Sequence, residues 1–402
     1  MHVELHPDLR DTQSGQTAAQ LTSACVHCGF CLATCPTYLD QRDERDSPRG
    51  RIYLIKQMLE TGEAGSATQT HLDRCLTCRS CETTCPSGMQ YGQLLDIGRE
   101  LVEQRVARPA LERVVRRSLR YVLTRPRLFK TVLTAGQLLR PALPRALREK
   151  VPARQSLRPR PAPNHKRRML VLEGCVQSVA TPATNIAARR VLDKLGITLV
   201  SISRAGCCGA VNYHLSAHDA GLDDIRRNID AWWQAIENGA EAIISSASGC
   251  SVMLADYGKL LQHDSQYADK AARVSALALD ISQVLAKENL EQLTLNTDIG
   301  RIAVQTPCSL QHGLQQPELI REILQRAGFS LAATRENHLC CGSAGTYSIL
   351  QAPTSERLRD DKISALTGAS PTLIATANVG CQLHLQQATA LPVVHWIELL
   401  DP

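Results

Sequence analysis

The chain has 402 residues, of which 44% are hydrophobic but only 3% aromatic, and its formal net charge is +6. This length allows two or three domains with mainly aliphatic cores. No apolar run approaches the roughly eighteen residues that a transmembrane helix needs, which excludes a membrane-spanning protein. The first twenty residues contain no apolar signal segment, so we expect a cytoplasmic protein. In that compartment the sixteen cysteines should be ligands or catalytic thiols, not disulfides.

After a polar lead-in, the chain presents two cysteine runs with the same spacing. The pattern is C-x2-C-x2-C-x3-C-P in both, and its members are Cys25, Cys28, Cys31, Cys35 and Pro36, then Cys75, Cys78, Cys81, Cys85 and Pro86. This spacing is typical of bacterial ferredoxins, and two runs in tandem predict two [4Fe–4S] clusters. A pair of zinc knuckles is the alternative, but zinc knuckles usually pair two cysteines with two others across a longer gap.

The spacing also suggests which cysteine binds which cluster. The first three cysteines of a run lie on one tight loop, and in two-cluster ferredoxins the fourth reaches the other cluster. The crossed quartets that we expect are therefore Cys25, Cys28, Cys31 and Cys85 for the first cluster, and Cys75, Cys78, Cys81 and Cys35 for the second.

Between the two runs the pattern predicts a helix. Ser47 is a suitable N-cap and Pro48 suits the first turn, while Ile52, Ile55 and Leu59 recur at helical spacing. Residues 1–100 are thus expected to form one helical domain that resembles the enlarged ferredoxin domain of respiratory iron–sulfur subunits.

Residues 101–168 form a basic connector. They contain 19 Lys and Arg against 3 Glu, a net charge of +16, so the rest of the chain carries −10. Apolar residues recur at helical spacing on one face, namely Leu111, Val114, Val115, Leu119 and Val122. The connector is either a solvated linker packed on the ferredoxin domain, or a surface that docks on an acidic partner or anionic lipid. No nucleic-acid motif accompanies the charge, so nucleic acid is not expected as a partner.

The C-terminal half is a repeat. Cys175, the pair Cys207–Cys208 and Cys250 recur as Cys308, Cys340–Cys341 and Cys381, at offsets of 133, 133 and 131 residues. We therefore expect two copies of one cysteine-rich module, residues 169–299 and 300–402.

Each copy alternates strands and helices. Strands are expected over 168–173, 197–202 and 242–247, and again over 302–305 and 373–377. Such alternation predicts a mainly parallel sheet, whose sites lie beyond the carboxyl ends of the strands. The fold class is thus an α+β multidomain protein, with a helical ferredoxin domain, a helical connector and two α/β modules.

The repeated cysteines are candidate metal ligands. Gly209 and Gly342 follow the cysteine pairs and allow the backbone to turn close to a ligand. The expected quartets are Cys175, Cys207, Cys208 and Cys250, then Cys308, Cys340, Cys341 and Cys381. Thiol count alone does not separate an additional iron–sulfur cluster from zinc, and buried structural thiols are a further alternative. His214 and His338 are expected to be structural, and the three tryptophans to belong to the core.

The long phrases around these cysteines resemble the iron–sulfur subunits of flavin-linked respiratory dehydrogenases. Among them the chain is most similar to the iron–sulfur subunits of bacterial glycolate oxidases. The phrases are ACVHCGFCLATCPTY from Ala24, SPRGRIYLIKQ from Ser47, HLDRCLTCRSCETTCPSG from His71, AGCCGAVNYHL from Ala205 and HLCCGSAGTYS from His338.

The resemblance implies an electron-transfer subunit that does not itself oxidise substrate, with no catalytic residue of its own. Its partners would be FAD-containing subunits that oxidise glycolate to glyoxylate. Its acceptor would be a quinone at the inner membrane, with which the protein would associate peripherally. Lactate and glycerol 3-phosphate dehydrogenases have similar subunits and remain alternatives.

One departure separates the chain from heterodisulfide reductases, whose modules end in C-x-x-C. Ala247 and Asn378 stand where that pattern has the first of the two cysteines. This puts in doubt the unusual cluster and the thiol chemistry of that branch, although a thiol oxidoreductase stays an alternative, as does a zinc-stabilised binding protein.

Overall fold

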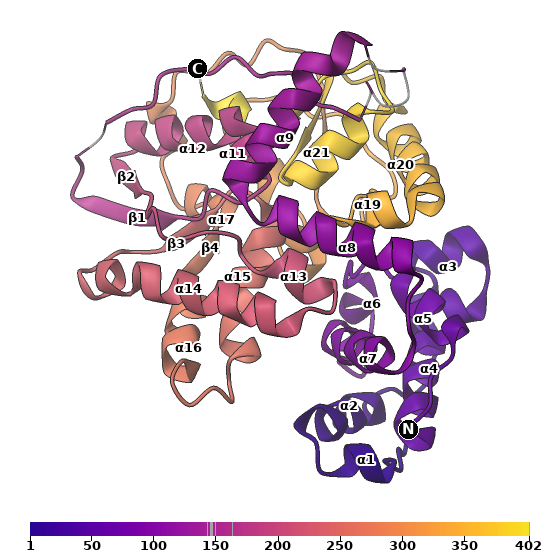
Figure 1. Ribbon diagram of the computed structural model, residues 1–402. Coiled ribbons are helices and arrows are strands. Elements are labelled where there is room, and N and C mark those ends of the chain that lie inside the picture. The colour runs from indigo at the N-terminus through magenta and orange to yellow at the C-terminus, as the bar shows by residue number, and fades with distance from the viewer. Residues whose placement is uncertain (143, 145–147, 149, 163, 402) are drawn as a thin grey trace.

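The computed structural model describes residues 1–142, 144, 148, 150–162 and 164–401. Figure 1 shows a helical N-terminal region at one end of the molecule and two α/β units with parallel sheets at the other. Helices α8 (Ala110–Leu123) and α9 (Pro126–Leu139) run across the front of both regions. The predicted fold class, a helical domain followed by two repeated α/β modules, is confirmed.

The N-terminal region is helical throughout the part that the structure describes. Its elements are α1 Pro7–Arg10, α2 Gln13–Ser23, η1 Phe30–Leu32, α3 Pro36–Gln41, η2 Glu44–Asp46, α4 Pro48–Thr61, α5 Ser66–Asp73, α6 Ser80–Thr83 and α7 Tyr91–Arg105.

Helix α4 is the helix predicted between the cysteine runs, and its ends follow from its sequence. The Ser47 hydroxyl accepts a hydrogen bond from the Gly50 N–H at 3.0 Å, which satisfies one of the free amides of the first turn. Gly62 ends the helix in the left-handed region at φ 73°. Ile52, Ile55 and Leu59 point into the core of the region, where they are at most 3% exposed.

The connector begins with a continuation of the N-terminal region, because α7 runs on to Arg105. Helix α8 is then held by its arginines: Arg116 pairs with Asp73 at 3.0 Å, and Arg120 Nε donates to the Asn212 amide oxygen at 3.2 Å. Part of the positive charge of the connector therefore fastens it to its neighbours. Neither α8 nor α9 has a buried residue. The short helix η3 (Arg140–Ala142) follows α9.

The first module contains a four-stranded, fully parallel sheet in the order β2-β1-β3-β4. Its elements are β1 Arg167–Val171, α11 Gln177–Ala180, α12 Pro182–Lys194, β2 Ile197–Val200, α13 Ala210–His214, α14 His218–Glu237, β3 Ile243–Ser245, α15 Ser248–Leu260, α16 Ala268–Leu277, β4 Ala278–Asp280, α17 Ile281–Leu285 and η4 Leu290–Gln292.

The second module repeats this sheet as β5-β6-β7, also parallel. A bridge between Ile302 and Leu331 lies beside β5, in the place that β2 has beside β1. The elements are β5 Ile302–Gln305, η5 Ser309–Gly313, α18 Leu319–Arg326, α19 Tyr347–Leu350, α20 Ala352–Thr367, β6 Leu373–Thr376, α21 Val379–Gln386, β7 Val393–His395 and η6 Trp396–Leu400.

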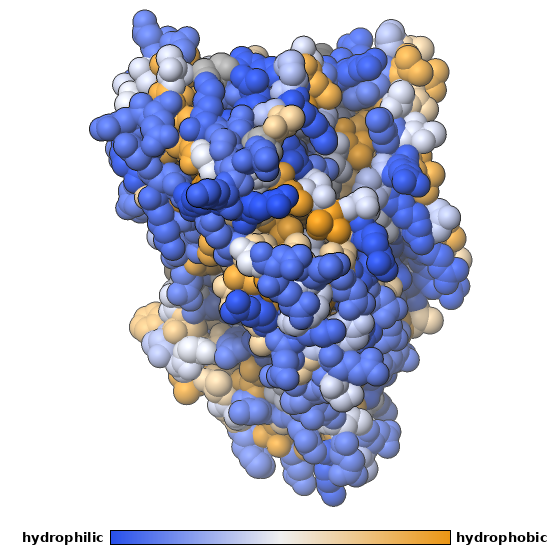
Figure 2. Space-filling view, turned by 90° about the vertical axis from the view of Figure 1, so that its left-hand side faces the viewer, coloured by the Kyte–Doolittle hydropathy of each residue, from blue (hydrophilic) through white to orange (hydrophobic). Residues whose placement is uncertain are grey.

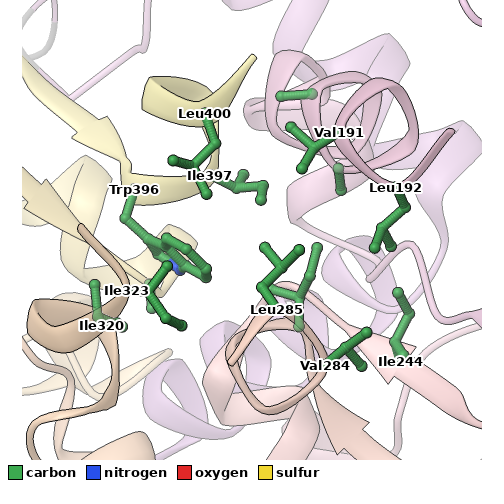
Figure 3. Close-up of a cluster of buried hydrophobic side chains, with 14 of the residues drawn as sticks. Val191, Leu192, Ile244, Val284, Leu285, Ile320, Ile323, Trp396, Ile397 and Leu400 are labelled. Carbon is green, nitrogen blue, oxygen red and sulfur yellow. The ribbon is translucent and has the colours of Figure 1, made fainter. Parts of the chain in front are cut away.

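The two modules share one hydrophobic core. Figure 3 shows Val191 and Leu285 of the first module facing Ile323, Trp396 and Leu400 of the second. All five are fully buried. Because these side chains interdigitate across the boundary, the two modules form one packed unit. The outer face shown in Figure 2 is mostly hydrophilic, with scattered apolar groups.

Replacing Trp396 by Ala should therefore destabilise both modules together. The side chain is 0% exposed, and a cavity of this size costs about 3–5 kcal/mol of unfolding free energy. Chemical denaturation measures the loss. Trp233→Ala is the control because that ring is only partly buried; equal losses for the two variants would show that Trp396 does not join the modules.

Candidate metal centres

The two cysteine runs of the N-terminal region fold into the same loop. His27 and Gly29 in the first run have φ of 55° and 85°, and the residues at the same positions of the second run, Thr77 and Arg79, have φ of 54° and 59°. A β-branched residue such as Thr77 rarely adopts this left-handed conformation. Strain of this kind is typical of functional sites, and here it turns the backbone around the sulfurs; the Thr77 N–H donates to Cys75 Sγ at 3.4 Å.

These loops line two cavities. The first is lined by Cys25, Cys28, Cys31 and Cys85, and the second by Cys35, Cys75 and Cys78; Cys81 borders both. The grouping is the one that the crossed assignment requires, since Cys85 lies with the first run and Cys35 with the second. Which sulfur binds which cluster stays a prediction.

A buried cation stands beside the second cavity. Arg51 is 1% exposed and lines the cavity with Cys35 and Cys75. Its guanidinium donates to His71 O at 2.7 Å and pairs with Asp46 at 3.3 Å. Burial alone would lower the pKa of Arg51, but the neighbouring Cys75, Tyr91 and Cys35 raise it above its ordinary value. The positive charge is therefore permanent.

Asp46 is itself fully buried and completes this network. It also accepts hydrogen bonds from Arg74 at 2.9 Å and lies 2.9 Å from His71 Nδ1. The ligand atoms of Asp43, Asp46 and His71 lie close enough to one another to hold a metal ion. The two arginines already neutralise Asp46, however, so the group is an internal ion-pair network.

In the first module the structure brings the four predicted cysteines together at the carboxyl ends of the strands. Cys175 follows β1, and Cys250 lies in the first turn of α15 after β3. Cys175 Sγ is 3.4 Å from Cys207 Sγ, and Cys208 interacts with both Cys207 and Cys250. Gly209 is needed beside the pair: its φ is 95°, and a Cβ there would lie 2.9 Å from the carbonyl oxygen of Gly221.

The second module repeats the arrangement. Cys308 Sγ is 3.8 Å from Cys340 Sγ, and Cys341 Sγ is 3.0 Å from Cys381 Sγ. Gly342 has φ 84°, and a Cβ there would lie 2.5 Å from Ser355 O. All eight cysteines of the modules are thus gathered into the two expected quartets.

The spacing of the sulfurs can be compared with what each candidate metal requires. One tetrahedral zinc ion with Zn–S bonds of about 2.3 Å would hold its sulfurs about 3.8 Å apart, every pair alike. Among the residues that the structure describes, no three cysteine sulfurs lie within 4.8 Å of one another. Each quartet is instead a row of neighbouring sulfurs whose contacts of 3.0–3.8 Å are no longer than the zinc spacing, and a multi-iron group would require these sulfurs to move apart.

Burial and neighbouring thiols favour the protonated form of one cysteine in each quartet, Cys175 and Cys308. The hydrogen bond with Cys207, together with burial, raises the pKa of Cys175 well above its ordinary value. The hydrogen bond with Cys340, together with burial, does the same for Cys308. Binding a metal would therefore release protons and convert the thiols to ligands.

The two histidines expected to be structural are placed away from ligand roles. His214 Nδ1 lies 3.1 Å from Asp96, and His338 is paired with Glu336 at 3.7 Å. The position at which five-cysteine modules have a further cysteine holds Ala247 in the first module and Asn378 in the second. Ala247 precedes α15 as its N-cap, and the Asn378 side chain caps α21 by accepting from the Gly380 N–H at 3.2 Å.

Two buried cations were not predicted from the sequence. Arg51 lies within the helical phrase SPRGRIYLIKQ, but nothing in that phrase distinguishes it from a surface arginine. Lys362 lies on α20 and is 3% exposed; it interacts with Cys341, Cys340, Cys381 and Cys308. Charged residues on an amphipathic helix are ordinarily assigned to its solvent face.

These features define an iron–sulfur protein with a two-cluster ferredoxin domain and two cysteine-rich domains. Residues 22–89 match the family model for a 4Fe-4S dicluster domain, and residues 169–255 and 302–386 each match the model for a cysteine-rich domain.

Relatives that are similar over most of the chain identify the family more closely. The chain is 51% identical over 402 residues to the glycolate oxidase iron-sulfur subunit of Escherichia coli K12, covering 100% of this chain and 98% of that protein. It is 31% identical over 394 residues to the probable glycolate oxidase iron-sulfur subunit of Bacillus subtilis 168, covering 90% and 88%. Lactate utilization protein A of Geobacillus thermodenitrificans is 23% identical over 227 residues, or 54% of this chain and 92% of that protein. The chain belongs to the family of glycolate oxidase iron–sulfur subunits.

The crossed assignment predicts the outcome of a single substitution. Cys35→Ser should alter the EPR spectrum of the cluster held by Cys75, Cys78 and Cys81, because Cys35 lines their cavity. Cys28→Ser is the matched control and should alter the other cluster. Loss of only the cluster carried by Cys25, Cys28 and Cys31 in the Cys35 variant would rule out the crossing.

Proposed function

We propose that this chain is the electron-relay subunit of a glycolate-oxidising complex. It would accept electrons from FAD-containing subunits that oxidise glycolate to glyoxylate, and deliver them to a quinone-type acceptor. The observation that supports this most is the similarity over the full chain to a glycolate oxidase iron–sulfur subunit, combined with four cysteine quartets in one packed molecule.

The residues of the two cavities fit [4Fe–4S] clusters. Four cysteine sulfurs are available for each, with Cys81 between the cavities, and soft thiolates are the ligands that such clusters need. A bound [4Fe–4S] cluster supplies reversible one-electron transfer. The loops hold the sulfurs, and the buried Arg51 places a positive charge where reduction would add a negative one.

The modules would hold further iron–sulfur groups in their cysteine quartets, in preference to zinc. The all-thiolate ligand set, the burial of most of these sulfurs and the similarity of the whole chain to an iron–sulfur subunit support this choice. Asn378 and Ala247 leave each module with four cysteine ligands, which argues against the thiol chemistry of five-cysteine modules.

The connector would contact the inner face of the membrane. On α8 and α9 several large apolar residues are more than half exposed, namely Leu111, Val114, Tyr121, Val132, Leu138 and Leu139. Exposed arginines such as Arg113 and Arg117 lie on the same helices. Apolar and basic side chains together are typical of helices that lie in the interface of anionic membranes. None of the described helices is long and apolar enough to cross a bilayer.

The substrate assignment is tested with the intact complex. The chain is purified together with its FAD-containing partner subunits, and dye reduction is measured with glycolate, D-lactate and glycerol 3-phosphate. We expect glycolate to be oxidised at least tenfold more efficiently, as kcat/KM, than either alternative. A preference for D-lactate or glycerol 3-phosphate would reassign the complex while leaving the relay role intact.

Membrane contact through the connector should be salt-sensitive, because exposed charges are screened over roughly 10 Å at 0.1 M salt. Binding to vesicles that contain anionic lipid should fall as salt rises, and Leu111→Ser and Arg117→Gln should each weaken it. Ile349→Ser is the control, since Ile349 is 55% exposed but lies on the second module. If vesicles do not bind while the FAD-containing subunits do, the connector is a protein-docking surface.

A further inference from the structure

The two modules are repeats, but the N-terminal region meets the cysteines of only one of them in a packed contact that the structure describes. Cys78 and Cys308 both pack against a buried cluster that contains Leu76, Cys340 and Tyr347. The pKa of Cys78 is raised mainly by burial. Among its neighbours Cys308 raises this pKa the most, more than Cys75, which belongs to the same predicted quartet as Cys78. The second cavity therefore adjoins the quartet of the second module.

A hydrogen-bonded side chain joins the same two sites. The Thr83 hydroxyl, at the end of the short helix that carries Cys81, lies 2.9 Å from His312 Nδ1. His312 Nε2 lies 2.9 Å from His338 O, two residues before Cys340. Val179 occupies the position of His312 in the first module, at the repeat offset of 133 residues. The hydrogen-bonded link from Thr83 through His312 is therefore a feature of the second module, because a valine cannot form it in the first.

Charge also distinguishes the modules. Lys362 is 3% exposed, and its ammonium donates to Glu336 O at 2.7 Å and to Asn337 O at 3.2 Å, in the segment that leads to Cys340. In the first module Asn228 on α14 contacts the corresponding segment, where its amide donates to Cys207 O at 2.7 Å. A buried cation thus faces the second quartet, and a neutral amide the first.

We propose that the second module is the electron-transfer neighbour of the ferredoxin region, and that Lys362 is the positioning residue that favours the reduced state there. The proposal rests on the proposed function, in which both sites hold iron–sulfur groups. One electron would pass from a group held by Cys35, Cys75, Cys78 and Cys81, which would be oxidised, to a group held by Cys308, Cys340, Cys341 and Cys381, which would be reduced. No bond to the protein forms or breaks, and no proton is transferred.

The direction of the proposed electron transfer follows from electrostatics. Reduction adds one negative charge to the receiving site, and a buried ammonium lowers the energy of that state because the interior screens charges weakly. Charge and hydrogen bonding around the sulfurs are among the factors that set cluster potentials. Without such a cation, the first-module quartet should be harder to reduce.

The first experiment is an anaerobic redox titration of the full chain followed by EPR, together with iron analysis. Cys341→Ser and Cys208→Ser identify the signals of the second and first modules. At the potential that half-reduces the second-module group in the wild type, Lys362→Gln should lower the ratio of reduced to oxidised group about tenfold. Lys362→Arg should restore it. Lys194→Gln, an exposed lysine at the amino end of the first sheet, should have no effect.

The second experiment tests adjacency. Magnetic coupling between a reduced ferredoxin cluster and a module group should disappear in Cys341→Ser and persist in Cys208→Ser. Coupling that depends on Cys208 instead would overturn the assignment of the second module as neighbour. A Lys362→Gln chain with full iron and an unchanged titration would overturn the role of Lys362.

Iron content separates failure of this proposal from failure of the proposed function. Two [4Fe–4S] clusters account for about eight iron atoms per chain, so groups in the modules require more. A wild-type chain with only eight iron atoms after anaerobic purification would show that the modules hold no iron, and would overturn this inference together with their assigned role. Substrate oxidation by the FAD-containing subunits would be unaffected.

Discussion

The structure depends on bringing together sulfurs that lie far apart along the chain. In the modules this follows from parallel strands, because all strands of such a sheet end at one edge. Cys175 and Cys250 are separated by most of the first module, yet both follow strands, β1 and β3, that are neighbours in the sheet. In the N-terminal region the same convergence comes from crossing, with Cys35 and Cys85 each lying in the cavity of the other run.

Convergence of buried thiols has an electrostatic consequence. Deprotonated sulfurs this close in a poorly screening interior repel one another, and bound iron and buried cations are the means of offsetting that repulsion. Arg51 and Lys362 supply such cations at two of the four sites. Both donate hydrogen bonds to backbone carbonyls, Arg51 to His71 O and Lys362 to Glu336 O. These bonds compensate part of the cost of burying a charge and fix the position of each cation.

Much of this organisation could be predicted from the sequence. Cysteine spacing and the offsets of the repeat depend only on local order along the chain, so the quartets followed from them. The parallel sheets followed from the alternation of strands and helices. The short strands β4 and β7 were not predicted because three residues carry little periodicity. Lys362 and Arg51 were not predicted for a different reason. Their burial results from packing between distant segments, which the pattern of a single helix does not record.

The two modules share a core, but their cysteine sites have different neighbours. Two identical modules joined through Val191, Leu285 and Trp396 would present two equivalent sites, and electrons would have no preferred direction between them. The N-terminal region removes that equivalence, because Cys78 packs with the cysteines of the second module. Once the sites differ in neighbour, selection can also alter their charge, and the contrast between Lys362 and Asn228 is such a difference. In the proposed relay, substitutions around the sulfurs would thus give an internal duplication a direction, while the sulfurs themselves are kept.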